Sequence, residues 1–338
     1  MSDSKREYLS EFAVGMYTAR WVMIPSSEIN ADKEIPLEIQ EVLDTCHIYI
    51  ISKIPSLSFC KDTFEYKNET IIGNLLYKVN GEKRELSFNQ NFPLLDNATG
   101  VKVSKYPHRK IITFNDKNQD IRNLPANLLG LGSQMHVKNK ELRNLEVLYI
   151  GQAYGDSGNR SAVDRLKSHS TLQKILAEVQ HSSPDDEVYV LTFEYMPYQV
   201  ITSMDGRSNA KIKDYRDIQR FHSILDNPLT EYQQICLIEA GLIRYFQPTY
   251  NKIYKDSFPS EKHKILEKCY ELDFSGLIVE INTEELSFLL YSEVVSPRYH
   301  HIGKIELTDP DERWGFFHFS VGDNQTIKTP DVISRTKG

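Results

Sequence analysis

The sequence predicts a mixed α+β protein in which two β-rich regions flank a small α/β domain with an antiparallel sheet. Runs rich in β-branched and aromatic residues, typical of strands, dominate residues 1–107 and 255–338. Residues 108–254 instead alternate strand and helix patterns, in the order strand, helix, strand, helix at their centre. These three ranges are the expected domains.

In the N-terminal region the clearest local pattern predicts a hairpin. Two runs of alternating apolar residues flank Asn80-Gly81, a dipeptide that accepts the positive φ angles of a two-residue turn. Strands are expected at "TARWVMIP" and "HIYIISKIP", with a short helix at "PLEIQEVLD" between them. Target recognition and dimerisation are the two roles considered for this region.

The central region contains the two strongest helix patterns. After a strand at "LEVLYIG", an apolar stripe predicts one continuous helix over "SAVDRLKSHSTLQKILAEVQ". A strand at "EVYVLTFEYMP" then leads to a helix over "LTEYQQICLIEAGLIRYFQP", where Thr230 and Gln233 fit a capping box and Pro248 marks the end. Upstream, "RKIITFND" is expected as a strand and "PANLLGL" as a short helix.

The C-terminal region is expected to return to strands. The candidate segments are "SGLIVEI", "ELSFLLYSEVV", "GKIELT" and "WGFFHF". The tail "TIKTPDVISRTKG" is expected to be frayed.

Composition narrows the class of protein. The chain has 338 residues, 40% hydrophobic and 26% charged, with a net charge of −7. That charge disfavours non-specific coating of nucleic acid but allows a local basic cleft. The polar N-terminus and the absence of a long apolar run predict a cytoplasmic protein without a membrane segment.

Neither the cysteines nor the histidines have the spacing of a metal site. The four cysteines are too far apart in sequence for a CxxC pair, so we expect reduced and mostly buried thiols. His300, His301 and His318 have no cysteine or carboxylate beside them at ligand spacing, so they are not expected to bind a metal.

Three polar side chains fall on faces that should be buried or partly buried. Glu239 lies three and four residues from apolar positions of its helix, so its carboxylate needs a partner, either a metal or an arginine such as Arg165 or Arg244. Arg165 and His169, at i and i+4, are expected on one helix face, where they suit a phosphate. A solvated surface pair is the alternative for these two residues.

In this order, the motifs resemble those of the GIY-YIG nuclease family over about residues 145–251. The residues that carry the resemblance are Tyr149-Ile150-Gly151, Arg165, His169, Glu239 and Asn251, the last residue of "FQPTYN". The resemblance implies a small three-layer α/β domain and a metal-dependent endonuclease that hydrolyses phosphodiester bonds, with double-stranded DNA as the expected substrate. A homodimer would allow one site per strand.

The resemblance also implies a role for each residue. Glu239 would hold Mg²⁺, with Mn²⁺ as a substitute, and Tyr149 would orient or deprotonate the attacking water with help from Lys167 or Arg165. Arg165 would clamp the phosphate, and His169 would bond a phosphate oxygen or assist Tyr149. Asn251 would fix the glutamate or the backbone, and Gly151 would allow a sharp turn.

The family has a second tyrosine on the strand before the "YIG" strand. The nearest upstream strand, "KIITFN", offers Phe114, and Tyr106 is the other candidate. The long stretch between His169 and Glu239 is expected to hold an insertion. Two further hypotheses stay open, a nucleic-acid-binding module that has lost cleavage and a structural protein with a chance match.

Overall fold

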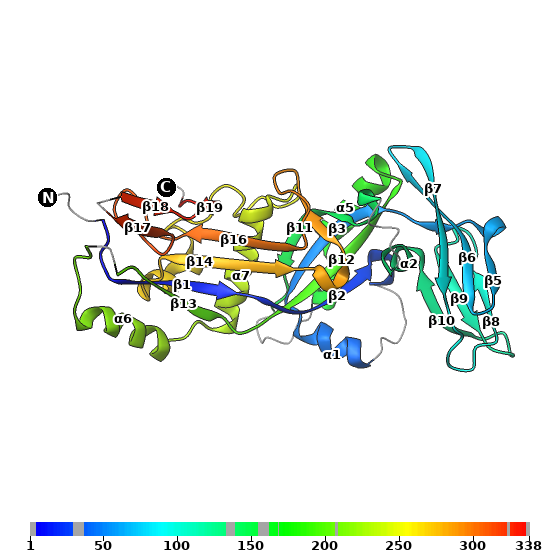
Figure 1. The fold of residues 1–338 in the computed structure, drawn as a ribbon, viewed down its shortest axis with the longest axis horizontal. Coiled ribbons are helices and arrows are strands. Elements are labelled where there is room, and N and C mark those ends of the chain that lie inside the picture. The colour runs from blue at the N-terminus through cyan, green and yellow to red at the C-terminus, as the bar shows by residue number, and fades with distance from the viewer. Residues whose placement is uncertain are drawn as a thin grey trace.

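The computed structural model of the chain describes residues 5–29, 37–132, 139–154, 162–167, 169–206, 209–322 and 325–335. Within them the predicted α+β class is confirmed, because helices cover two mixed sheets and a third region consists almost entirely of strands (Figure 1). No helix in the described part of the chain has the length and apolar character needed to cross a membrane.

The central sheet has five strands in the order β15-β11-β3-β12-β2. Their bounds are Leu289–Tyr291 (β15), Asn144–Gln152 (β11), Ile48–Pro55 (β3), Asp186–Tyr195 (β12) and Thr18–Pro25 (β2). All neighbours are antiparallel except β11 and β15. The middle strands are buried on both faces, which explains why β3 is an unbroken apolar run at its start.

Two helices cover the two faces of this sheet. Ile48 and Ile50 of β3 face the core that contains helix α7 (Glu231–Phe246), whereas Tyr49 and Ile51 face the core that contains helix α5 (Ser170–Ser182). This division follows from the alternation of side chains along a strand. Tyr49 and Tyr149, described below, lie on the α5 side, whereas Glu239 comes from α7.

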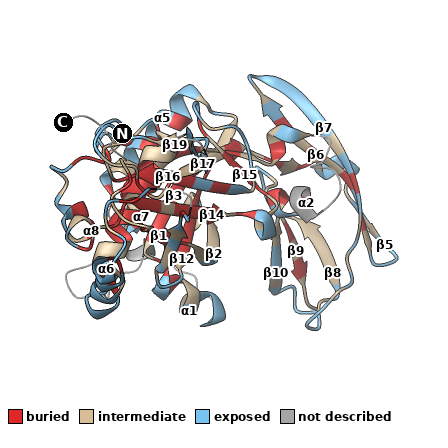
Figure 2. Ribbon diagram, turned by 60° about the vertical axis from the view of Figure 1, so that its left-hand side comes forward, coloured by how far each residue is buried: buried red, intermediate tan, exposed pale blue. Residues whose placement is uncertain are grey.

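The second sheet also has five strands, in the order β13-β1-β14-β16-β19. Their bounds are Gln199–Met204, Ser10–Met16, Gly276–Asn282, His300–Glu306 and Val332–Ile333. Helix α7 contributes buried residues to the core shared by both sheets, and Figure 2 shows the buried residues concentrated around it. At Gly241 a Cβ atom would lie 2.6 Å from Cγ2 of Val279, so glycine allows α7 to approach β14 closely.

A separate β-rich module lies between β3 and β11 in the chain, at one end of the molecule (Figure 1). It comprises β4 (Ser58–Phe59), β5 (Glu65–Lys67), β6 (Thr70–Val79), β7 (Glu82–Asn91), β8 (Gly100–Val103), β9 (Lys110–Phe114), β10 (Asp120–Pro125) and α2 (Ala126–Gly132). It has its own hydrophobic core. The predicted hairpin at Asn80-Gly81 is confirmed, with φ angles of 53° and 81°.

The remaining elements are short or lie at the periphery. They are α1 (Leu37–Thr45), α4 (Ala162–Lys167), α6 (Tyr215–Asp226), α8 (Glu267–Glu271), β17 (His318–Gly322), β18 (Gln325–Lys328) and the 3-10 turns η1 (Ser26–Glu28), η2 (Lys61–Thr63), η3 (Lys140–Leu142), η4 (Lys264–Leu266) and η5 (Glu284–Leu286). The predicted helix at α1 is confirmed. Thr230 and Gln233 form the predicted capping box of α7, which ends just before Pro248.

Strand pairing does not follow the predicted domain boundaries. β2 and β3, from the expected N-terminal region, and β15, from the expected C-terminal region, all belong to the central sheet with β11. Conversely, β9 pairs with β8 and β10 in the inserted module. The boundaries at 107 and 254 are wrong because segments that neighbour each other in the sequence join different sheets.

The predicted continuous helix is in fact two helices. α4 and α5 are separated at His169, whose φ of −84° and ψ of 110° are extended; Ser161 and Ser168 lie outside the described residues. Leu166 and Leu172 are buried apolar residues on either side of His169. They are six residues apart, a spacing that does not place two side chains on one face of a helix. The apolar stripe therefore breaks where the helix breaks.

The expectation of a frayed C-terminal tail is wrong for residues up to 335. β18 pairs with β17, and β19 pairs in parallel with β16 at the edge of the second sheet. Residues 336–338 of this segment lie outside the described residues.

Candidate active site

Two tyrosines from neighbouring strands form the centre of a polar cluster. In the β3–β11 pair, Tyr49 lies opposite Gly151, and Tyr149 lies opposite Ile51. The register shifts between Val147 and Tyr149, so this bulge turns Tyr149 toward the face on which Tyr49 lies. The two ring centroids are 6.2 Å apart.

Gly151 makes room for these rings. A Cβ atom there would lie 2.5 Å from the hydroxyl oxygen of Tyr49 and 2.9 Å from Cε1 of Tyr149, which real Cβ atoms do not tolerate. Its φ is outside the left-handed region, so the expected role in a sharp turn is wrong. The glycine is needed here because two aromatic rings lie where a side chain would be.

His169 joins the two tyrosines from the helical layer. Its Nε2 lies 3.3 Å from the Tyr49 hydroxyl, and its ring centroid is 5.8 Å from that of Tyr49 and 5.5 Å from that of Tyr149. Burial, together with the positive charge of Arg165, lowers the pKa of the imidazole below its usual value of 6.5. The ring is therefore neutral at pH 7. Its buried Nδ1 has no hydrogen-bond partner among the described residues.

Arg165 reaches the same group from the last turn of α4. Its side chain hydrogen-bonds with Tyr49, and its charge acts on Tyr49, Tyr149, His169 and Glu239. The expectation that Arg165 and His169 lie on one helix face is wrong, because the helix breaks before His169, but both side chains contact Tyr49. Lys167 is exposed on α4 and is not among the groups that shift the pKa of Tyr149.

Glu239 approaches the tyrosines from α7. Burial raises the pKa of its carboxyl to about 7, against the opposing effects of a hydrogen bond from the Gln152 backbone and of the Arg165 charge. The alternative of an ion pair with Arg244 is wrong, because Nη1 of Arg244 donates to the Lys255 carbonyl at 2.7 Å. A half-buried carboxyl whose pKa lies near neutral pH therefore faces the tyrosine pair.

Asn251 clamps the backbone of β11 at the centre of the motif. Its Oδ1 accepts from the Ile150 amide at 2.9 Å, and its Nδ2 donates to the Ile150 carbonyl at 2.8 Å. Ile150 lies between Tyr149 and Gly151. Of the two roles considered for Asn251, the structure therefore supports fixing the backbone.

The second tyrosine was missed by the sequence analysis. Tyr106 is 88% exposed in the module, and Phe114 lies on β9 under the ammonium of Lys102, so neither expected candidate is near Tyr149. Tyr49 fills that place and is 1% exposed. The sequence does contain this tyrosine in the predicted strand "HIYIISKIP". An inserted module of about one domain's length separates that strand from "YIG", so the two do not look like neighbours in the sequence.

The stretch between His169 and Glu239 does contain additional elements, as expected. Its strand β13 pairs with β1 in the second sheet, and it also contains α6. These elements build the neighbouring sheet and leave the tyrosine cluster intact.

The environment of the two phenols limits their chemistry. Burial and the negative charge of Glu239 raise the pKa of Tyr149, and burial raises that of Tyr49 even more strongly. Both phenols are therefore protonated at pH 7 and suited to orienting a ligand by hydrogen bonds.

The described residues contain no cluster of three or more His, Cys, Asp or Glu that could hold a metal. Glu239 alone would have to supply the protein ligand for Mg²⁺, which often keeps several waters and takes one or two carboxylates. A half-buried carboxyl whose pKa is raised by burial suits that role, because a cation would favour its ionised form.

The cysteines, His301 and His318 have structural surroundings. All four cysteines are free, and three are buried, as expected. Nε2 of His301 lies 3.0 Å from two backbone carbonyls, and Nδ1 of His318 lies 2.9 Å from the buried Glu306.

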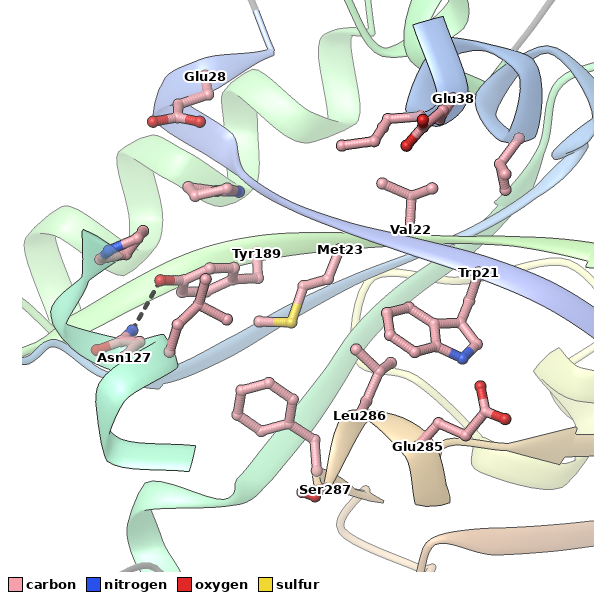
Figure 3. A pocket seen from close by; sticks show the side chains of 16 residues that line it. Trp21, Val22, Met23, Glu28, Glu38, Asn127, Tyr189, Glu285, Leu286 and Ser287 are labelled. Atoms are coloured by element: carbon pink, nitrogen blue, oxygen red, sulfur yellow. Dashed lines mark hydrogen bonds between the residues drawn. The ribbon is translucent and has the colours of Figure 1, made fainter. Parts of the chain in front are cut away.

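A large apolar cavity lies away from the tyrosines. Its volume is about 660 Å³, and its walls include Trp21, Met23, Tyr189 and Phe288 (Figure 3). None of the residues of the tyrosine cluster lines it, so volume alone does not identify the chemically distinctive site.

Comparisons with protein-family models, with curated proteins and with solved structures found no match for this chain.

Proposed function

We propose that the chain is a metal-dependent endonuclease related to the GIY-YIG nucleases, with DNA as its substrate. The observation that carries the proposal is the meeting of Tyr49, Tyr149, Arg165, His169 and Glu239 around Gly151. These residues come from two strands and two helices that are far apart in the sequence, and a chance match to one motif would not bring them together.

The tyrosine pair also supports the proposal. The tripeptide His47-Ile48-Tyr49 lies on the strand beside Tyr149-Ile150-Gly151, where the family would have Gly-Ile-Tyr. The tyrosine is kept, whereas a histidine directly before the strand stands in place of the glycine. The backbone clamp of Asn251 on Ile150 holds the second tripeptide in place.

In the proposed reaction, water attacks the phosphorus and the bond to the leaving oxygen breaks. Arg165 binds the phosphate and stabilises the charge that develops on it. Tyr149 orients the water, because its raised pKa makes it a poor base. The proton of the attacking water passes along the hydroxyls of Tyr149 and Tyr49 to Nε2 of the neutral His169, and the leaving oxygen takes up a proton from solvent water.

Glu239 would hold the divalent cation. When bound, Mg²⁺ supplies charge neutralisation at the phosphate and the leaving oxygen. The carboxyl must give up its proton for this, so we expect metal binding to release a proton near pH 7 and to weaken as the pH falls through that value.

Cleavage of plasmid, linear and single-stranded DNA, and of RNA, in the presence of Mg²⁺ or Mn²⁺ tests the proposal. Glu239→Gln should reduce the cleavage rate at least a hundredfold. The matched control is Glu82→Gln, because Glu82 is an exposed glutamate of the inserted module, away from the cluster. Unchanged cleavage in Glu239→Gln would reject the mechanism, whereas metal-independent binding without cleavage would identify a binding module.

A further inference from the structure

A group of aromatic rings lies beside the site on the side of Glu239. The ring centroids of His47 and Tyr154 are 5.3 Å apart, and those of Tyr154 and Tyr232 are 5.7 Å apart. Tyr232 is 53% exposed. We call His47, Tyr154 and Tyr232 the aromatic platform.

The platform is tied to the site by helical geometry. Tyr232 and Glu239 are seven residues apart on α7, so they share a face and lie ~10 Å apart along the axis. Cys236 lies between them on that face and interacts with both. This separation corresponds to about three base steps of a stacked strand.

Two further contacts connect the platform with the site. Tyr154 follows the end of β11, where the backbone of Gln152 hydrogen-bonds with Glu239. Glu239 and Tyr232 both raise the pKa of Tyr254, so Tyr254 lies near both. The platform therefore adjoins the site.

The orientation of Tyr154 is fixed by polar contacts. Its hydroxyl donates to Oε2 of Glu231 at 3.3 Å, and Nε2 of His47 lies 3.9 Å from the other oxygen of that carboxylate. The His47 backbone carbonyl also accepts from the Ala153 amide at 2.8 Å. These contacts add to the packing of Tyr154 against the core and fix the direction of its ring.

Cationic side chains near the site suit a nucleic-acid backbone, whereas the platform itself carries the exposed carboxylate of Glu231. Arg165 and Lys167 are exposed on α4, and Lys252 is exposed directly after the clamped Asn251. Aromatic rings next to cationic side chains are the combination that binds unpaired nucleotides, because each base has a face that can stack. A paired duplex keeps its bases stacked on one another.

We propose that the aromatic platform stacks against an unpaired base of the nucleic acid whose phosphate lies at Glu239. This inference rests on the proposed function and names its preferred substrate, which is DNA with an unpaired nucleotide about three steps from the cleaved bond. Fully paired duplex of the same sequence is the poorer ligand.

The test measures binding by the full chain without metal, so that no cleavage occurs. Two DNA probes of one sequence are compared, a paired duplex and a duplex with a short unpaired bubble that carries 2-aminopurine. We expect the bubble to bind about tenfold more tightly and its fluorescence to be quenched on binding. Equal affinity for the two probes would overturn the inference.

Substitutions of the platform tyrosines distinguish stacking of their rings on a base from packing of their side chains within the protein. Tyr232→Leu and Tyr154→Leu should each reduce the bubble preference several-fold, whereas Tyr232→Phe should keep it, because the ring remains. Tyr215→Leu is the matched control, since Tyr215 is 66% exposed on α6, a different helix. A bubble preference unchanged in both platform variants would overturn the inference.

Cleavage measured separately distinguishes the two proposals. If the protein cleaves DNA but shows no preference for the bubble, the platform is rejected and the endonuclease stands. If it prefers the bubble through Tyr232 but never cleaves with any metal, the hydrolytic function is rejected and the platform stands.

Discussion

Two buried carboxyl groups in this protein have opposite surroundings. Glu11, on β1, is fully buried, and Arg313, Arg6 and Arg220 lie 2.9, 3.8 and 3.9 Å from its oxygens. Glu239 faces one arginine and one backbone amide, and its pKa is raised to about 7. The protein surrounds Glu11 with three arginines, whereas Glu239 has one arginine and one backbone amide beside it.

The arginine cluster around Glu11 connects elements that are distant in sequence. Arg313 and Arg220 both also pair with Asp273, and Arg220 pairs with Asp217 of α6. Removing one member leaves a buried charge without compensation. The same argument does not apply to Arg165, whose side chain is exposed.

The largest expected effect is therefore on stability at the Glu11 cluster. Arg313→Met should lower the free energy of unfolding by about 4 kcal/mol. Arg165→Met should change it little but should reduce cleavage strongly. Urea unfolding of both variants checks this, and equal losses of stability would remove the distinction between the two carboxyl groups.

Gly151→Ala should destabilise the protein by about 2 kcal/mol, because the added Cβ would overlap the Tyr49 ring. It should also reduce cleavage, since the two tyrosines cannot keep their positions. Gly206→Ala is the control, because a Cβ there meets nothing within 4 Å. Thermal unfolding of the two variants, side by side, gives the comparison.

Glu239 should make stability depend on pH in a defined window. Its folded pKa of about 7 lies above the usual 4.5, so the protonated form is favoured by folding. Ionisation of the Glu239 carboxyl lowers the free energy of unfolding. This loss is absent below pH 4.5 and grows until the pH passes about 7. At pH 8, Glu239→Gln should be more stable than the natural chain by about 2 kcal/mol, and at pH 4 the two should be equal. Denaturation without metal at both pH values checks this, and equal stability at pH 8 would contradict it.

The smallest effect is expected at the backbone clamp. Asn251→Asp keeps the acceptor for the Ile150 amide but loses the donor to the Ile150 carbonyl, so we expect a loss of about 1 kcal/mol. Asn251→Leu removes both hydrogen bonds and should cost more. Hydrogen exchange at the Ile150 amide measures the clamp directly, and unchanged protection in Asn251→Leu would show that the clamp is dispensable.

Local patterns in the sequence predicted local structure well. The Asn80-Gly81 hairpin and the capping box at Thr230 are set by turn and capping chemistry within a few residues. Spacing on α7 also predicted that Glu239 would be partly buried. What could not be predicted was pairing across long separations, because periodicity does not say which strand lies beside which.

The candidate site shows the same difference between local and long-range prediction. The sequence predicted Tyr149, Arg165, His169, Glu239 and Asn251. It did not predict Tyr49, because a whole module separates Tyr49 from Tyr149 in the chain. The break between α4 and α5 was also missed, although the spacing of Leu166 and Leu172 contained it.

The position of the inserted module has a consequence for how such a protein can diversify. Lys53 of β3 pairs with Glu146 of β11, so the ends of the insertion lie about 5 Å apart. A short turn, or an insert of another size, could bridge the same gap without moving Tyr49 relative to Tyr149. The segment inserted between β3 and β11 can therefore change while the positions of Tyr49 and Tyr149 stay fixed.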